Sequence, residues 1–156
     1  MMKKLWRVVV CTRTSGRHVD AALLVFRIGL GSTMLTHGWG KLTGFGERAS
    51  SFGNPIGVGP EVSMALAVFA EFFCSVALML GLTTRLAAIP LLVTMLVAAI
   101  IVHTDDGWRR QELPTLYALC YFTLMWLGSG RYSIDRLLDS TSHANREADE
   151  MQTSIN

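Results

Sequence analysis

The chain has 156 residues, of which 51% are hydrophobic and only 17% are charged, and its formal net charge is +2. This length suits one domain and argues against a multi-domain enzyme. The small net charge gives no reason to expect a nucleic-acid partner, and an average soluble domain would carry about 25% charged residues. The composition therefore favours a membrane protein.

The charged residues avoid four apolar stretches of the sequence. Only Arg27, Lys41 and Glu71 lie inside these stretches, whereas a soluble helical bundle would show a charged face on every helix. A membrane helix needs roughly 17–25 mostly apolar residues to cross the hydrocarbon layer. The predicted fold class is therefore all-α. We expect an antiparallel bundle of four transmembrane helices, with spans at about residues 21–42, 62–82, 86–102 and 113–130.

The two ends of the chain lie outside this membrane domain, which covers residues 21–138. Residues 1–20 are expected to form a basic cytoplasmic tail, because the apolar run after Arg7 is too short for a signal peptide. Residues 139–156 are polar, and we expect them to be disordered.

The connections between the spans predict how the helices follow one another. Thr83-Thr84-Arg85 is so short that spans two and three must form a tight antiparallel hairpin. Pro90 falls in the first turns of span three and Pro114 at the start of span four, where a missing N–H matters least. The first loop is rich in glycine, and we expect one short interfacial helix in it, at Glu47–Phe52.

The distribution of Lys and Arg predicts the orientation in the membrane. Nine of these residues lie on the side of the two termini and four on the opposite side. Both termini are therefore expected to be cytoplasmic.

Polar residues within the spans are costly unless they are paired or hydrated. Helical geometry places Arg27, His37 and Lys41 on one face of span one, and small residues flank Glu71 on its own face of span two. We expect Glu71 and His37 to converge near the external surface. We expect Arg27 to extend instead toward the cytoplasm.

These positions lead to two hypotheses. The first is an externally facing polar pocket formed by His37, Lys41, Glu71 and His103. The second is a structural contact between Glu71 and His37 that holds the bundle together. Both remain open on the sequence alone.

The cysteines and aromatic residues favour packing roles. The three cysteines, Cys11, Cys74 and Cys120, are too scattered for a dithiol redox motif or a zinc site. Tyr117 and Tyr121 share one face of span four and would pack in the bundle or line a cavity for a flat ring. Tryptophans near the ends of the spans are typical of the membrane interface; they are Trp39, Trp108 and Trp126.

Three blocks of sequence carry a resemblance to a known family. The first runs from Arg27-Ile28-Gly29-Leu30-Gly31 to His37-Gly38-Trp39-Gly40-Lys41, and the second joins Ala70-Glu71-Phe72-Phe73 to Leu80-Gly81-Leu82-Thr83-Thr84-Arg85. The third is Gly128-Ser129-Gly130-Arg131-Tyr132-Ser133-Ile134-Asp135. In order and spacing these blocks resemble the DoxX family of small bacterial membrane proteins.

The resemblance implies a four-helix protein of the bacterial inner membrane that is linked to redox physiology. The family is similar to the DoxD-type subunit of thiosulfate:quinone oxidoreductase. The positions that match the family motifs outside the expected pocket are Arg27, Gly38, Arg85, Gly130, Tyr132 and Asp135. Cys74 and Ser75 stand where the family usually has paired glycines, which is expected to loosen the packing against span two.

Three functions follow as hypotheses. The first is a membrane subunit of an oxidoreductase complex that binds a quinone or a small sulfur species in the polar pocket. The sequence shows no haem ligand pair, flavin motif or metal cluster, so this hypothesis includes no cofactor other than a quinone. The electrons would have to come from a partner protein. The second is a non-catalytic scaffold that docks an oxidoreductase partner in the bilayer. The third is a small transporter, which four spans would form only as a homo-oligomer.

Overall fold

A computed structural model describes residues 16–138 of the chain. Within this range every regular element is helical and there is no strand, as predicted for an all-α fold. The elements in chain order are α2 (Gly16–Thr43), α3 (Phe45–Arg48), the 3₁₀ turn η1 (Ala49–Ser51), α4 (Pro60–Val68), the π-helix η2 (Phe69–Cys74), α5 (Ser75–Leu80), α6 (Thr84–Val97), the π-helix η3 (Ala98–Val102) and α7 (Trp108–Leu127). The two predicted tails, 1–20 and 139–156, fall largely or wholly outside the described residues.

Three helical rods are long and apolar enough to cross a membrane. They are α2, the continuous α4–η2–α5 rod over Pro60–Leu80, and the α6–η3 rod over Thr84–Val102. They correspond to the first three predicted spans. The α2 helix begins at Gly16, earlier than the predicted residue 21, because helical backbone continues through polar residues that lie beyond the hydrocarbon.

The α7 helix differs from the prediction at both ends. It begins at Trp108, because Gly107 adopts φ 77° and starts the helix before the apolar stretch does. Pro114 therefore lies in the second turn of α7 rather than at its start, as the sequence had suggested. The helix ends at Leu127, because Gly128 at φ 83° leaves the helical conformation, so residues 128–130 do not extend it.

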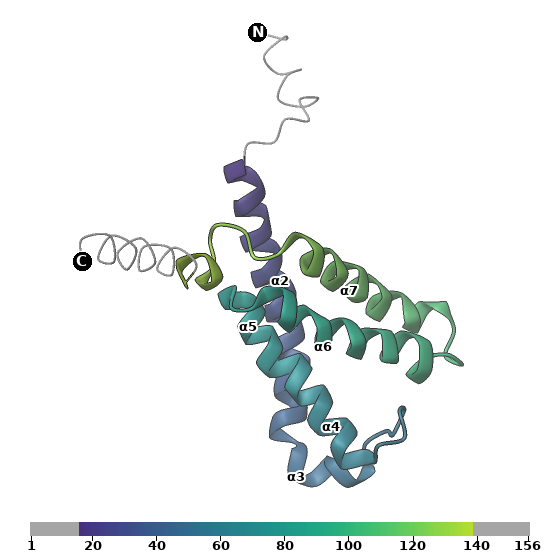
Figure 1. The fold of residues 1–156 in the computed structure, drawn as a ribbon. Coiled ribbons are helices and arrows are strands. Elements are labelled where there is room, and N and C mark those ends of the chain that lie inside the picture. The colour runs from purple at the N-terminus through teal and green to yellow at the C-terminus, as the bar shows by residue number, and fades with distance from the viewer. Residues whose placement is uncertain (1–15, 139–156) are drawn as a thin grey trace, which may run out of the picture.

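The helices form two arms, each of which is a pair of antiparallel rods (Figure 1). One arm is α2 with the α4–η2–α5 rod, and the other is the α6–η3 rod with α7. We call the end of the bundle where α5 ends and α6 begins the Arg27 end. From there the two arms diverge (Figure 1), and we call the opposite side, toward which α2 ends and α7 begins, the His37 end.

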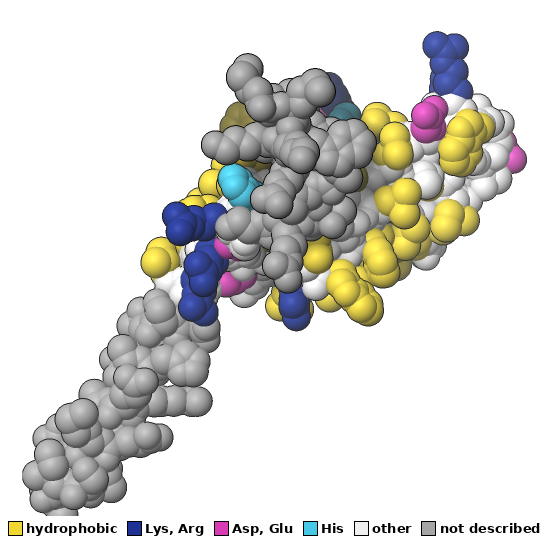
Figure 2. Space-filling model, turned by 90° about the horizontal axis from the view of Figure 1, so that it is seen from above, with side chains coloured by type: hydrophobic (Ala, Val, Ile, Leu, Met, Phe, Trp, Pro, Cys, Tyr) yellow, Lys and Arg dark blue, Asp and Glu magenta, His cyan; other side chains and the backbone are white. Residues whose placement is uncertain are grey.

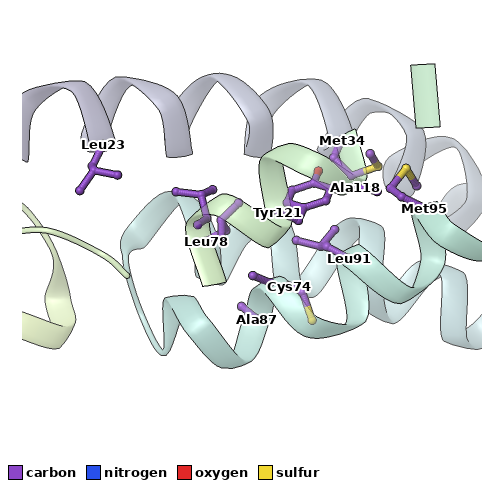
Figure 3. Close-up of a cluster of buried hydrophobic side chains, with 11 residues drawn as sticks. Leu23, Met34, Cys74, Leu78, Ala87, Leu91, Met95, Ala118 and Tyr121 are labelled. Atoms are coloured by element: carbon purple, nitrogen blue, oxygen red, sulfur yellow. The ribbon is translucent and has the colours of Figure 1, made fainter. Parts of the chain in front are cut away.

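The core lies where the two arms meet (Figure 3). Leu78, Leu91, Leu124 and Tyr121 are fully buried there, and Cys74 packs among them. The outward faces of the same helices carry large exposed hydrophobic side chains, and Figure 2 shows such side chains spread over one surface of the bundle. Apolar surface on this scale is expected where a helix faces lipid rather than water.

The predicted tight hairpin is present between α5 and α6. Gly81 adopts φ 68° after the last turn of α5, and the N–H of Leu82 donates to the carbonyl of Ala77 at 2.9 Å. Thr83 then adopts φ 46°, the left-handed region that a residue with a Cβ rarely occupies. Its N–H donates to the Asp135 carboxylate at 2.6 Å, which helps hold this backbone in place.

The first loop contains helical structure close to the predicted position. The expected helix at Glu47–Phe52 is instead the single turn α3 over Phe45–Arg48, followed by η1 over Ala49–Ser51. Phe52 is already extended, with ψ 151°.

Candidate functional site

A cavity of about 190 Å³ lies at the His37 end, between the two arms. His37 and Lys41 from α2, Glu71 from η2, and His103 just after η3 contribute its polar lining. The four residues of the predicted polar pocket therefore lie around one cavity. Apolar side chains and Tyr117 complete the wall, so the lining of the cavity is mixed polar and apolar.

Lys41 and Glu71 form an ion pair across the first arm. The Lys41 ammonium lies 2.5 Å from Glu71 Oε2, and the Glu71 side chain is only 5% exposed against 27% for Lys41. The carboxylate is therefore the deeper partner and depends more on the pair.

Glu71 and His37 converge on the same cavity, as expected, but the residue that pairs with the Glu71 carboxylate is Lys41. Lys41 lies one helical turn beyond His37 on the same face of α2, and its long side chain reaches back to the carboxylate. An ammonium neutralises a buried carboxylate, whereas a neutral imidazole does not. His37 lines the cavity and is itself exposed.

Gly38 allows the two helices of this arm to approach closely. A Cβ at this position would lie 2.6 Å from the Glu71 carbonyl carbon and 2.6 Å from the Phe72 nitrogen. Small residues permit such approach between membrane helices. Backbone contact at Gly38 is what brings Lys41 within reach of Glu71.

Both π-helices lie beside the cavity. Glu71 is part of η2, and η3 ends directly before His103, whose N–H donates to the carbonyl of Ala98, five residues earlier, at 3.0 Å. A π-turn fits one extra residue into a helix and changes the direction of the side chains that follow it. Such turns are rare and frequently occur at functional sites.

His103 is oriented by the loop that follows it. Its Nδ1 donates to Asp106 Oδ2 at 2.7 Å, and Arg110 donates to the same oxygen at 3.3 Å. These hydrogen bonds, that of His103 first, hold the pKa of Asp106 below its ordinary value. Because Nδ1 is occupied, Nε2 is the ring nitrogen of His103 left for other partners.

Tyr117 and Tyr121 stack along α7, with ring centroids 6.1 Å apart and 20° between the planes. They share one face, as the sequence predicts. Tyr117 lines the cavity, whereas Tyr121 is fully buried below it. Within residues 16–138 the Tyr121 hydroxyl has no hydrogen-bond partner.

Arg27 reaches toward the end of the bundle that the sequence assigns to the cytoplasm, as expected, but it does not extend to the surface there. The residue is fully buried at the other end of the bundle. Its Nη1 donates to the carbonyl of Leu78 at 3.3 Å, and its Nη2 donates to the carbonyl of Tyr132 at 2.5 Å. Leu78 lies in the last turn of α5, and the carbonyls at the C-terminal end of a helix carry partial negative charge, which favours a cation there.

The remaining family-motif residues also gather at the Arg27 end, away from the cavity. Asp135 accepts hydrogen bonds from the N–H groups of Thr83 and Thr84, at 2.6 and 3.2 Å, at the start of α6. Gly130 adopts φ 72°, and Arg85 lies against Gly128. No pattern in the sequence indicates that these separate motifs meet.

Cys74 and Ser75, which replace the paired glycines typical of the family, lie inside the bundle. Both residues are buried, and the glycines that permit close approach lie on α2 instead. A Cβ at Gly31 would lie 3.1 Å from the Ser75 carbonyl oxygen. Cys120 is half-buried and Cys11 lies outside the described residues. In the described part of the chain no group of His, Cys, Asp and Glu could hold a metal ion.

Comparison with known proteins agrees with these features. The DoxX family profile matches residues 22–104, which is more than half of the chain. The chain belongs to the DoxX family. Inner membrane protein YqjF of Escherichia coli K12 is 31% identical to this DoxX protein over 124 residues, covering 77% of this chain and 94% of YqjF.

Other relatives are also membrane proteins or carry no descriptive name. "Uncharacterized membrane protein Rv3486" of Mycobacterium tuberculosis is 32% identical over 90 residues, covering 47% of this chain and 54% of that protein. A protein of Haemophilus influenzae is 27% identical over 125 residues, covering 75% of this chain and 83% of its own. No solved structure shows significant similarity. This DoxX protein is therefore a multi-pass protein of the bacterial inner membrane.

Proposed function

We propose that this DoxX protein is a redox-linked membrane subunit that binds a quinone headgroup in the cavity at the His37 end. The observation that carries the proposal is the joining of four polar side chains from both arms around one cavity at the edge of the apolar region. Three arguments, from topology, size and charge, support it.

The proposal includes the four-span topology expected from the sequence, with the cavity near the external surface. As a fourth span α7 has 20 residues, which at 1.5 Å per residue gives about 30 Å, the thickness of the hydrocarbon layer. Four spans leave both termini on one side. The excess of Lys and Arg on that side assigns it to the cytoplasm, so the His37 end faces outward.

The size of the cavity suits a ring rather than a whole lipid. A volume of about 190 Å³ is below the roughly 300–1,000 Å³ typical of sites that enclose a drug-sized ligand. A headgroup ring fits this space if its tail remains in the bilayer. Leu113 lines the cavity and is also 55% exposed on the lipid side of α7, so the wall continues into the membrane.

The charge balance favours a neutral ligand over a sulfur anion. Lys41 is already neutralised by Glu71, and the two histidines add no fixed charge when neutral. A quinone needs only hydrogen-bond donors for its carbonyl oxygens, which Lys41 and His37 supply. The Nε2 of a neutral His103 accepts rather than donates, because its Nδ1 donates to Asp106, so it suits the hydroxyl of the reduced ring. In this proposal His37 exchanges protons with the ring and a partner oxidoreductase exchanges the electrons.

The test compares two histidines of the same helix. His37 lines the cavity, whereas His18 is exposed near the start of α2 and serves as the matched control. We would extract the protein in mild detergent and measure bound quinone per protein by mass spectrometry. His37→Ala is expected to lower bound quinone about tenfold and His18→Ala to leave it unchanged. Equal quinone in both variants, or none in the wild type, would contradict the proposal.

A second candidate function is a scaffold that docks an oxidoreductase partner. The Lys41–Glu71 ion pair favours it, because the pair joins α2 to η2 and therefore also serves assembly. A partner protein that stays bound after His37→Ala and Glu71→Gln, with no quinone in any preparation, would support the scaffold instead.

A further inference from the structure

A second cavity, of about 690 Å³, lies at the Arg27 end. It is formed by the start of α6, the end of α7 and the segment at 128–136 that returns across this end. It shares no lining residue with the cavity at the His37 end. The side chains important here are Thr84, Arg85, Leu86, Leu127, Ser129 and Arg136. We call this cavity the Arg85 hollow.

The hollow carries positive charge. Arg85 is exposed and lies against Gly128, where a Cβ would be 3.2 Å from its Nε. No carboxylate among residues 16–138 forms an ion pair with it. The Asp135 carboxylate also lines the hollow, but the backbone N–H groups of Thr83 and Thr84 occupy its oxygens. Arg136 adds a second cation to the lining.

A hydroxyl in the wall lacks a partner. Thr84 is only 1% exposed, and its Oγ1 makes no hydrogen bond to any described residue. Buried hydroxyls in native proteins normally have a partner, so this group calls for an acceptor that is not part of the described chain. A phosphate oxygen beside Arg85 would be such an acceptor.

The flanks of the hollow are apolar and face the lipid. Leu86 is 67% exposed on α6 and Leu127 is 53% exposed on α7. An inorganic anion would gain nothing from these surfaces, whereas acyl chains would pack along them. A cationic recess with apolar flanks at the end of a membrane helix therefore matches an amphiphile with an anionic head.

We propose that the Arg85 hollow binds one anionic phospholipid, with its phosphate on Arg85 and Thr84 and its acyl chains along Leu86 and Leu127. The head of the lipid would fill the space between the start of α6 and the end of α7. This site is independent of the quinone proposal, because no residue is shared.

The experiment measures lipid binding to the full-length protein by native mass spectrometry. Phosphatidylglycerol is the anionic probe, phosphatidylcholine the zwitterionic comparison, and inorganic phosphate the competitor. We expect phosphatidylglycerol to bind about tenfold more tightly than phosphatidylcholine, and millimolar phosphate not to displace it. Arg85→Gln should weaken phosphatidylglycerol binding about tenfold. The matched control is Arg131→Gln, which removes a 72% exposed cation from the same end but outside the hollow, and should change binding less than twofold.

A second variant keeps the test decisive if Arg85→Gln does not fold. Thr84→Val conserves the shape of the side chain, breaks no hydrogen bond within the described chain, and should weaken binding a few-fold. The proposal is overturned if the two phospholipids bind equally, if Arg85→Gln and Arg131→Gln have the same effect, or if phosphate displaces the lipid.

Discussion

Lys41 and Glu71 are unequal partners in their ion pair, and single substitutions should reveal the difference. Lys41→Met leaves a carboxylate that is 5% exposed without its cation, which should cost about 3 kcal/mol in the free energy of unfolding. Glu71→Gln leaves a lysine that is 27% exposed and can still donate to the amide oxygen, so about 1 kcal/mol is expected. Thermal unfolding in mild detergent measures both.

The prediction depends on which variant loses more free energy of unfolding. Arg48→Met, which removes an exposed cation from the same end, serves as the control and should change stability by less than about 0.5 kcal/mol. A larger loss for Glu71→Gln than for Lys41→Met would mean that the lysine, not the carboxylate, depends on the pair.

Tyr121 offers a test of a different kind. Its hydroxyl is buried with no partner in the described chain, so the phenol carries a desolvation cost that phenylalanine avoids. Tyr121→Phe should keep the fold and raise the free energy of unfolding by about 1 kcal/mol. A loss of stability would show that the hydroxyl binds an internal water or a group outside residues 16–138.

The positions of single residues could be predicted from the sequence better than their partners could. All four residues of the predicted pocket, Lys41, Glu71 and the two histidines, line one cavity, and helical geometry predicts this nearness because the 100° step per residue gives the face and the 1.5 Å rise gives the depth of each side chain. Helical geometry did not identify the partner of Glu71, since that depends on how far each side chain reaches. The burial of Arg27 depends on Tyr132, which is 105 residues away, and no local pattern encodes that contact.

At the scale of the helices, Gly38 sets the distance between α2 and η2. Gly38→Ala places a methyl group 2.6 Å from backbone atoms of Glu71 and Phe72, which cannot move aside as a side chain can. We expect a loss of about 2 kcal/mol in the free energy of unfolding. Gly40→Ala is the control on the same helix, because a Cβ there meets nothing within 4 Å. Similar losses for both would mean that helix flexibility, not close packing, explains the glycine.

The helices that correspond to the first three predicted spans agree with the prediction to within a few residues at most ends, because the length of an apolar stretch reflects the thickness of the bilayer. The largest error concerns the start of α2 and of α7. Both helices continue through charged residues that hydropathy reads as loop. The π-turns at η2 and η3 were not anticipated either, since an extra residue in a helical turn has no signature in composition.

At the scale of the whole molecule, the proposed four-span topology makes a prediction about accessibility. In a variant without native cysteines, Asn54→Cys and Asp105→Cys lie in exposed loops of the His37 end and should react with a membrane-impermeant maleimide in right-side-out vesicles. Arg17→Cys, exposed at the Arg27 end, should react only after the vesicles are opened. Labelling of Arg17→Cys in sealed vesicles would reverse or break the topology.

The hydrogen bond from Arg27 to the carbonyl of Tyr132 also has a consequence for the synthesis of the protein. A ribosome adds roughly 5–20 residues per second, so about 5–20 s separate the emergence of these two residues, which are 105 positions apart. Throughout that interval the guanidinium lacks one of its two carbonyl acceptors. A chain that terminates before Tyr132 keeps this buried cation permanently under-bonded. Such fragments should be degraded by inner-membrane proteases rather than accumulate, and a pulse–chase comparison with the full-length chain would measure the difference.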